Sequence, residues 1–243
     1  MKRSYVYIIM CIVLCLTACR EEQLSPRTGE AVLELDLQRM GRPSAAVTRA
    51  IDDDLAVDVF RQDGTLLVHY DAGHVVRKIV FNQEGTYRVV AYTDNQYLWS
   101  TANNGKGEGC YWGDTTVVME FDMVKRLQMR VPMTNYSVTL TLPELFNELF
   151  PSYTFTVASG NRSVSLREGE KVYFSPYDAG FTYKLSATNI DGEVHTASQI
   201  LYSNVERGKL YNLRYSFAGG SNDGGIDIVI TDDTQTDDTD VNL

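Results

Sequence analysis

The chain has 243 residues, of which 44% are hydrophobic and 22% charged, and its formal net charge at pH 7 is −10. A negative balance disfavours nucleic acid and anionic lipid as partners, because both are negatively charged themselves. The length and the hydrophobic content are sufficient for one or two domains with cores of their own.

The first 18 residues have the layout of a secretory signal peptide. Lys2 and Arg3 precede an apolar run at residues 5–16, and small residues follow up to Cys19. The run is too short to cross a hydrocarbon core of about 30 Å as a helix, so a retained transmembrane anchor is the weaker interpretation. We therefore expect an exported chain that is cut before Cys19.

The sequence Leu-Thr-Ala-Cys19 resembles the lipobox of bacterial lipoproteins, in which the cysteine sulfur carries lipid. The resemblance implies lipidation of Cys19 and a membrane anchor of several acyl chains, palmitate among them, which together hold a protein stably. Residues 19–29 are polar and indicate a tether. The acidic pair Glu21-Glu22 resembles the signal that sends Bacteroides-type lipoproteins to the exterior face of the outer membrane. Cleavage leaves Cys110 as the remaining thiol, which we expect to be a small buried hydrophobe.

Alternation of apolar and polar residues predicts β-strands along almost all of the remaining chain. The first strand is expected at residues 33–37, and a hairpin follows at 57–61 and 66–70 with Asp63-Gly64 in its turn. Further strands are predicted at residues 79–81, 87–92, 116–121, 127–131, 153–157, 163–166, 172–174, 183–188, 199–202 and 210–217. Short strands at this spacing are typical of β-sandwiches.

Residues 143–150 are the exception and predict a short amphipathic helix. Pro143 suits the first helical turn, Leu145 and Leu149 lie four residues apart, and Pro151 ends the run. We expect this helix to pack on the end of a sandwich, with a cofactor or partner role as the alternative.

Two halves of the chain resemble each other. Residues 79–91 and 172–187 share a pattern of two short strands with a glycine between them, at an offset of about 95 residues. We therefore predict two related domains. The full predicted division is a signal peptide (1–18), a lipidated tether (19–29), an N-terminal β-sandwich (30–132), a C-terminal β-sandwich (133–231) and an acidic tail (232–243).

Several motifs together resemble a family of Bacteroides-type surface lipoproteins related to fimbrillins and to fimbrial anchor and tip subunits. They are the lipobox, the first strand with Thr48-Arg49-Ala50 after it, Trp99 with Tyr111-Trp112-Gly113, and the segment 136–157. The resemblance implies an all-β fold of two tandem transthyretin-like (Greek-key, Ig-like) sandwiches, with one short helix in the second. It also implies a non-catalytic role in adhesion or in fimbrial assembly.

In the polymerising relatives, a trypsin-like protease cuts after an arginine near the end of the first strand, and a strand of a neighbouring subunit fills the groove. Arg49, followed by Ala50, occupies the matching position, so the resemblance implies a candidate processing site there. Strand addition is physically sound because a freed sheet edge presents unpaired N–H and C=O groups. The alternative is a solvated Arg49 and a retained first strand, as in anchor subunits that keep their lipid.

The C-terminal region predicts one more strand at residues 224–231, followed by a run of aspartates. We expect this strand to pair within its own second domain, because an unpaired apolar edge invites aggregation. Exchange with a partner subunit is the alternative.

Catalytic and metal-binding patterns are weak. His69, His74 and His195 stand in strand or turn segments without a nucleophile elbow. The sequence has no Cys-x-x-Cys, and Asp52-Asp53-Asp54 lacks the spacing of a calcium loop. We therefore predict no enzyme, no catalytic residue, no metal and no cofactor, although paired carboxylates that only the fold brings together stay open as an alternative.

Aromatic residues gather around the Gly-rich stretch 103–109, and flat rings of this kind stack on sugars. The candidate ligand contacts are Tyr97, Trp99, Tyr111 and Trp112, with core packing of the two tryptophans as the alternative.

Asp114-Thr115-Thr116 resembles a short O-glycosylation acceptor of these bacteria, which makes Thr115 a candidate for modification. The favoured function is an adhesin or a fimbrial accessory, anchor or tip subunit, with other fimbrial subunits or a host or glycan ligand as partners. The alternative is a surface glycan-binding lipoprotein of a polysaccharide uptake system.

Overall fold

The computed structural model of the chain describes residues 29–40, 54–74, 78–93, 99–175, 177–196, 199–217 and 226–232. The predicted signal peptide and lipidated Cys19, the candidate processing site Arg49–Ala50, and Tyr97 lie outside these residues, as does the acidic tail after Asp232. Within the described part of the chain, no helix is long and apolar enough to cross a membrane.

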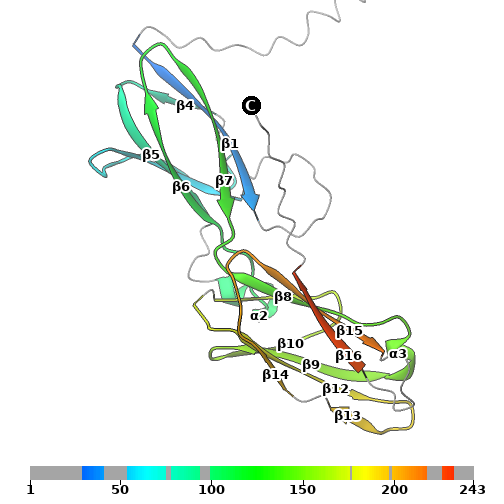
Figure 1. Ribbon diagram of the computed structural model, residues 1–243. Coiled ribbons are helices and arrows are strands. Elements are labelled where there is room, and N and C mark those ends of the chain that lie inside the picture. Colours follow the sequence, from blue (N-terminus) through cyan, green and yellow to red (C-terminus); the bar gives the residue numbers. More distant parts are fainter. Residues whose placement is uncertain are drawn as a thin grey trace, which may run out of the picture.

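The first half of the chain forms a sandwich of two sheets (Figure 1). Sheet A has the strand order β4-β1-β7, and sheet B has the order β3-β2-β5-β6. Neighbours in both sheets are antiparallel except β1 and β7, which run parallel. The strands are β1 (Ala31–Met40), β2 (Ala56–Arg61), β3 (Leu66–Tyr70), β4 (Lys78–Phe81), β5 (Gly85–Tyr92), β6 (Trp112–Met119) and β7 (Val124–Pro132).

The core of this sandwich lies between its two sheets. Leu33 and Leu37 of β1 belong to the same buried cluster as Val57, Val89 and Val117 of sheet B. These side chains point into the space between the sheets, because successive residues of a strand point to opposite faces. Burial of each large aliphatic side chain stabilises the fold by about 1.5–3 kcal/mol.

The second half forms another sandwich with a core of its own. Sheet C has the order β11-β8-β15-β16, and sheet D has the order β10-β9-β12-β13, with β14 also paired to β12. The strands are β8 (Tyr136–Thr141), β9 (Ser152–Ser159), β10 (Arg162–Leu166), β11 (Lys171–Phe174), β12 (Phe181–Thr188), β13 (Val194–Thr196), β14 (Ile200–Tyr202), β15 (Leu210–Phe217) and β16 (Ile226–Asp232). The predicted all-β sandwich fold is confirmed.

The two sandwiches repeat one topology. The order β4-β1-β7 of sheet A corresponds to β11-β8-β15 of sheet C. The parallel pair is β1 with β7 in sheet A and β8 with β15 in sheet C. The strand β16 has no counterpart in sheet A. It pairs antiparallel with β15, so the C-terminal strand adds to its own half of the chain, as expected.

The predicted helix at 143–150 is wrong in its extent. Only α3 (Phe146–Leu149) is helical, because the backbone of Leu145 takes a left-handed conformation with φ of 70°. Residues 143–146 instead form a turn, closed by the Phe146 N–H that donates to the Pro143 carbonyl at 3.0 Å. Its packing face also differs from the prediction, since Leu145 and Leu149 are 57% and 45% exposed while Phe146 is buried and stacks on Phe150.

The sequence patterns do not predict some of the other elements. A 3-10 turn η1 (Trp99–Thr101) and a single turn α2 (Ala102–Gly105) lie in the connection between β5 and β6. The edge strand β13 was not predicted, because all three of its side chains are exposed and show no alternation.

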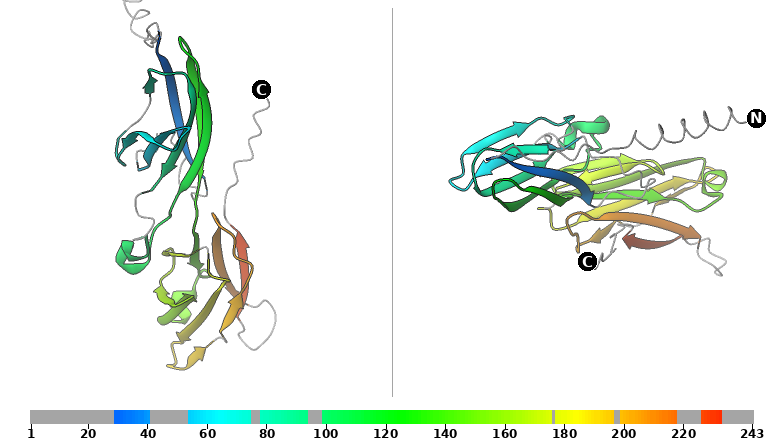
Figure 2. Two further views of the ribbon diagram at one scale, coloured as in Figure 1. Left: turned by 90° about the vertical axis from the view of Figure 1, so that its left-hand side faces the viewer. Right: turned by 90° about the horizontal axis from the view of Figure 1, so that it is seen from above.

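The two sandwiches follow each other end to end (Figure 2) and are joined by more than the chain. The connection with η1 and α2 reaches from the first sandwich to the second, where the guanidinium of Arg162 donates hydrogen bonds to the carbonyl oxygens of Gly105, Tyr173 and Ser100, the last at 3.3 Å. The Tyr173 N–H donates to the Lys106 carbonyl at 2.8 Å. One half-buried cation therefore binds both halves of the chain.

We expect Arg162→Met to weaken this junction. The substitution keeps the length of the side chain but leaves partly buried carbonyl oxygens without a donor, which costs about 1–3 kcal/mol. Chemical denaturation measures the loss, and hydrogen exchange of the amides at 99–109 should accelerate. Arg214→Met is the matched control, because Arg214 is exposed on β15. Equal protection of 99–109 in both variants would contradict the role of Arg162.

Candidate functional site

The strand β1 is the central strand of sheet A. It pairs with β7 from Val32 opposite Val124 to Met40 opposite Pro132, and with β4 on its other side from Ala31 opposite Phe81. Because both edges of β1 are occupied, its departure would leave the facing edges of β4 and β7 unpaired. The site of β1 between these strands, with its inward-facing pockets, is called the β1 seat below.

Buried apolar side chains stabilise the core-facing side of β1, and ion pairs stabilise its outer face. Ala31 and Leu33 are fully buried. On the outer face, Glu34 receives the Arg126 Nε at 2.8 Å and lies 3.5 Å from the Lys78 Nζ. The hydrogen bond from Arg126 is the main cause that lowers the pKa of Glu34, and Lys78 adds to the effect.

We expect Glu34→Gln to loosen β1 slightly. The lost ion pairs are partly exposed, so the free energy of unfolding should fall by about 0.2–1 kcal/mol at neutral pH. Because the pKa of Glu34 is lowered in the folded state, its contribution is present above the unfolded value and is lost as pH falls through the folded pKa. The variant should therefore lose less stability than the parent on acidification, as measured by denaturation at several pH values. Asp36→Asn serves as a control, and identical pH profiles of parent and Glu34→Gln would contradict the assignment.

The structure separates the predicted aromatic contacts. Tyr111 is only 6% exposed and belongs to the core, where the Arg39 guanidinium lies 5.2 Å from its ring centre. Trp112 is 38% exposed, although it is the next residue of the chain. Trp99 lies in the backbone turn η1. Among the side chains that the structure describes, Trp112 is therefore the one candidate contact that is exposed at the surface.

The other sequence candidates lie in ordinary strand positions. Thr115 is half-buried in β6, with its Cα opposite Val89. Cys110 is buried, and burial raises the pKa of its thiol to about 12. Its N–H donates to the side-chain oxygen of Asn135 at 2.9 Å, which places it at the junction of the two sandwiches.

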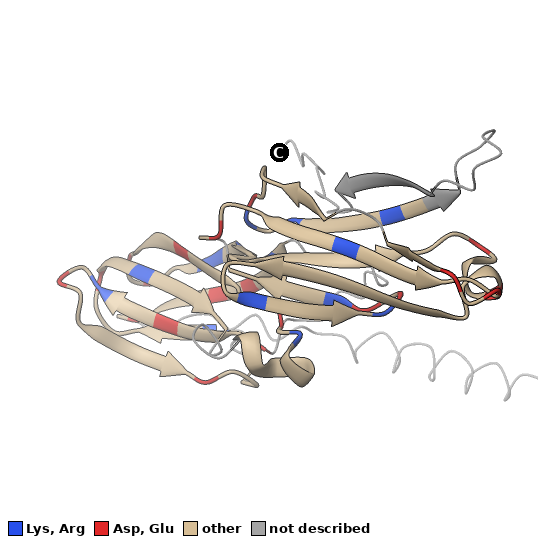
Figure 3. Cartoon of the chain, turned by 90° about the horizontal axis from the view of Figure 1, so that it is seen from below, with Lys and Arg blue, Asp and Glu red and all other residues tan. Residues whose placement is uncertain are grey.

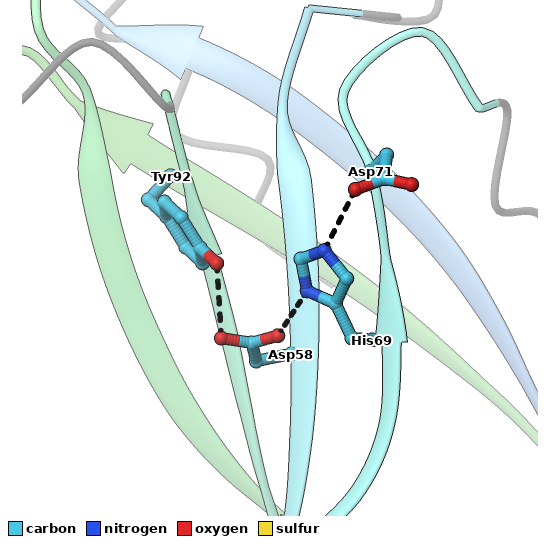
Figure 4. Close-up of polar contacts among 4 residues, drawn as sticks. All are labelled: Asp58, His69, Asp71 and Tyr92. Carbon is cyan, nitrogen blue, oxygen red and sulfur yellow. Dashed lines mark hydrogen bonds and ion pairs between the residues drawn. The ribbon is translucent and has the colours of Figure 1, made fainter.

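A polar cluster on the outer face of sheet B was not anticipated from the sequence (Figure 4). The ring of His69 on β3 lies between two carboxylates, with Nδ1 at 2.6 Å from Asp58 and Nε2 at 2.9 Å from Asp71. The hydroxyl of Tyr92 donates to the second oxygen of Asp58 at 3.1 Å. The predicted hairpin contained part of the signal, because it pairs β2 with β3. A register shift between Val59 and Phe60 then brings Asp58 opposite His69, and the sequence pattern does not predict that shift.

The geometry of this cluster favours a charged imidazole. Both ring nitrogens face carboxylates, and both donate when the ring is protonated. Hydrogen bonds to Asp58 and then to Asp71 raise the pKa of His69. The two carboxylates lie on opposite sides of the ring and do not converge on one point, and no group of three or more His, Cys, Asp or Glu among the described residues is arranged to hold a metal ion.

His69 should make stability depend on pH near neutrality. Since its pKa is raised on folding, its contribution is fully present below the unfolded value near 6.5 and is lost as pH rises through the folded pKa. Thermal unfolding between pH 5 and 9 should show this loss in the parent and not in His69→Gln. His74→Gln is the matched control, because His74 lies in the following turn. A pH profile that His69→Gln leaves unchanged would refute the prediction.

Basic and acidic residues are interspersed over both halves of the chain in the view of Figure 3, so neither sign gathers over one half in this view.

The chain belongs to the DUF4493 family, a domain of unknown function whose model matches residues 29–243. No curated protein sequence matches the chain.

Several solved structures are similar. A fimbrial assembly protein from Parabacteroides distasonis has a TM-score of 0.49 and 12% identity, covering 86% of this chain and 98% of its own. A proposed cell adhesion protein from Bacteroides ovatus has a TM-score of 0.47 and 13% identity, covering 85% and 96%. Proposed polysaccharide-binding proteins from Bacteroides thetaiotaomicron reach 0.42 and 10%, covering 82% and 98%.

Proposed function

We propose that the chain is an outer-membrane lipoprotein, anchored through Cys19 and facing the cell exterior, that acts without catalysis in adhesion or as a fimbrial accessory, anchor or tip subunit. The observation that carries the proposal is the β1 seat, because β1 is the one strand that stands between the lipid and the rest of the fold. Assembly by strand addition is the mechanism that this seat favours.

A cut between Arg49 and Ala50 would separate β1 from the body of the protein. Arg49 lies in the connection between the end of β1 at Met40 and the start of β2 at Ala56. After the cut, β1 and its lipid would be held by pairing and packing alone. The vacated seat would then present two unpaired edges and apolar pockets, which is an acceptor for a new strand.

The C-terminal strand β16 has a sequence suited to such a seat, although it pairs with β15 in its own half and would have to leave that sheet to be donated. Ile226, Ile228 and Ile230 alternate with Asp227 and Val229. Leu33, Leu35 and Leu37 of β1 alternate in the same way, with Glu34 in the position that Asp227 would take. A strand of this pattern from a second copy would supply apolar residues to the pockets and a carboxylate to Lys78 and Arg126.

Mass analysis of the mature protein from native cells tests the proposal. If the seat is used for exchange, chains that begin at Ala50 should be present, and Arg49→Gln should convert them to intact chains with acylated Cys19. Arg42→Gln is the matched control, since Arg42 lies in the same connection but outside the proposed motif. If native cells yield intact acylated chains alone, exchange is refuted. A mature chain without lipid and with no cut at Arg49 would refute the anchor as well.

A further inference from the structure

The outer face of sheet B places aromatic and polar residues in adjacent rows. The register sets Tyr92 opposite Trp112, and in the neighbouring row it sets Val90 opposite Asp114. Asp58 lies on the other side of Val90, and His69 lies beyond it. Rows two residues apart along a strand face the same side and are separated by about 6.6–6.8 Å.

Trp112 is the exposed apolar element of this face. It keeps 38% of its surface open, whereas its neighbour Tyr111 is almost completely buried. The indole N–H makes no hydrogen bond to any residue of the described chain, so it can donate to a ligand. A large ring with one polar handle is a common anchor at binding surfaces.

Asp114 lies beside Trp112 in a fixed orientation. Its Oδ2 receives both Nε and Nη2 of Arg88 at 2.7 Å. Its Oδ1 receives no hydrogen bond from the residues that the structure describes, so this oxygen remains available as an acceptor. An acceptor held by an ion pair loses little side-chain entropy when a ligand binds.

The remaining polar groups are occupied by each other. Both oxygens of Asp58 already accept hydrogen bonds, one from Tyr92 and one from the His69 ring. The hydrogen bond to Asp58 orients the hydroxyl of Tyr92, whose Cα lies opposite that of Trp112. Arg88 pairs with Asp114, and His69 lies between Asp58 and Asp71. With the imidazole protonated, two cations therefore face three carboxylates, so the face offers hydrogen-bonding groups and a small net negative charge.

The ligand that matches these groups is a neutral sugar. A pyranose has a flat face of C–H groups that can stack on an indole ring and a rim of hydroxyls that donate to carboxylates. A highly charged polymer would gain little from paired charges, and a purely apolar partner would desolvate Asp114 and Arg88 at a cost. We propose that the outer face of sheet B binds a neutral glycan, with Trp112 as the stacking platform and Asp114 as the hydroxyl acceptor.

Tryptophan fluorescence tests this assignment directly, because the chain contains only two tryptophans. In the full chain carrying Trp99→Phe, Trp112 is the sole indole. Titration with neutral gluco-, galacto- and manno-oligosaccharides should shift its emission in a saturable way for at least one series. In a glycan array of neutral and sialylated oligosaccharides, the same chain should bind preferentially to the neutral set.

Two variants and one control decide the outcome. By isothermal titration calorimetry, which needs no indole reporter, Trp112→Ala should reduce affinity at least tenfold, and Asp114→Asn should reduce it several-fold with circular dichroism unchanged. Tyr177→Ala is the matched control, because Tyr177 is an exposed aromatic of the second half, 82% accessible. Absence of binding across the panel overturns the proposal, as does binding that Trp112→Ala leaves intact. Neither result bears on strand exchange, because that proposal is tested by identifying the N-terminal residue of the mature chain.

Discussion

The pairing of β1 with two neighbours is the constraint on which the first sandwich depends. A parallel pair such as β1 and β7 cannot be closed by a tight turn, so its two strands come from distant parts of the sequence. Leu33 and Leu37 reach from this pair into the cluster that also holds Val57 and Val89 of the opposite sheet. The core is therefore complete only while the β1 seat holds β1 or a strand of the same pattern.

Local sequence patterns predict local structure well, but they do not predict contacts between residues that are far apart in the sequence. The turn signal at Asp63-Gly64 predicts the pairing of β2 with β3, because the two strands are close in the sequence. Tyr111 and Trp112 were grouped as equals, yet adjacent residues of a strand face opposite sides, and the pairing of β6 decides which one enters the core. The bonds of Arg162 to the turn at 100–105 join residues about sixty positions apart, which no periodicity in the sequence records.

The junction between the sandwiches has consequences for an anchored protein. The described chain enters β1 at the end of the first sandwich that lies away from the second (Figure 1). With a lipid on Cys19, this entry would set the second sandwich farther from the membrane. The bonds of Arg162, together with the Asn135 amide that donates to the Glu108 carbonyl at 2.8 Å, oppose free swivelling of that outer half.

The two proposed activities use opposite sheets of one sandwich, and the shared core couples them. The glycan face lies on the outer side of sheet B, while the inner side of the same sheet rests on β1 through Leu33 and Leu37. An empty β1 seat would expose that inner side to water at a cost of about 25 cal/mol per Å² of apolar surface. The strands β5 and β6, whose pairing aligns Trp112 with Tyr92, also supply Val89 and Val117 to this core. A chain that has lost β1 would therefore present a weakened glycan face until a replacement strand restores the core, so strand capture and ligand binding would favour each other.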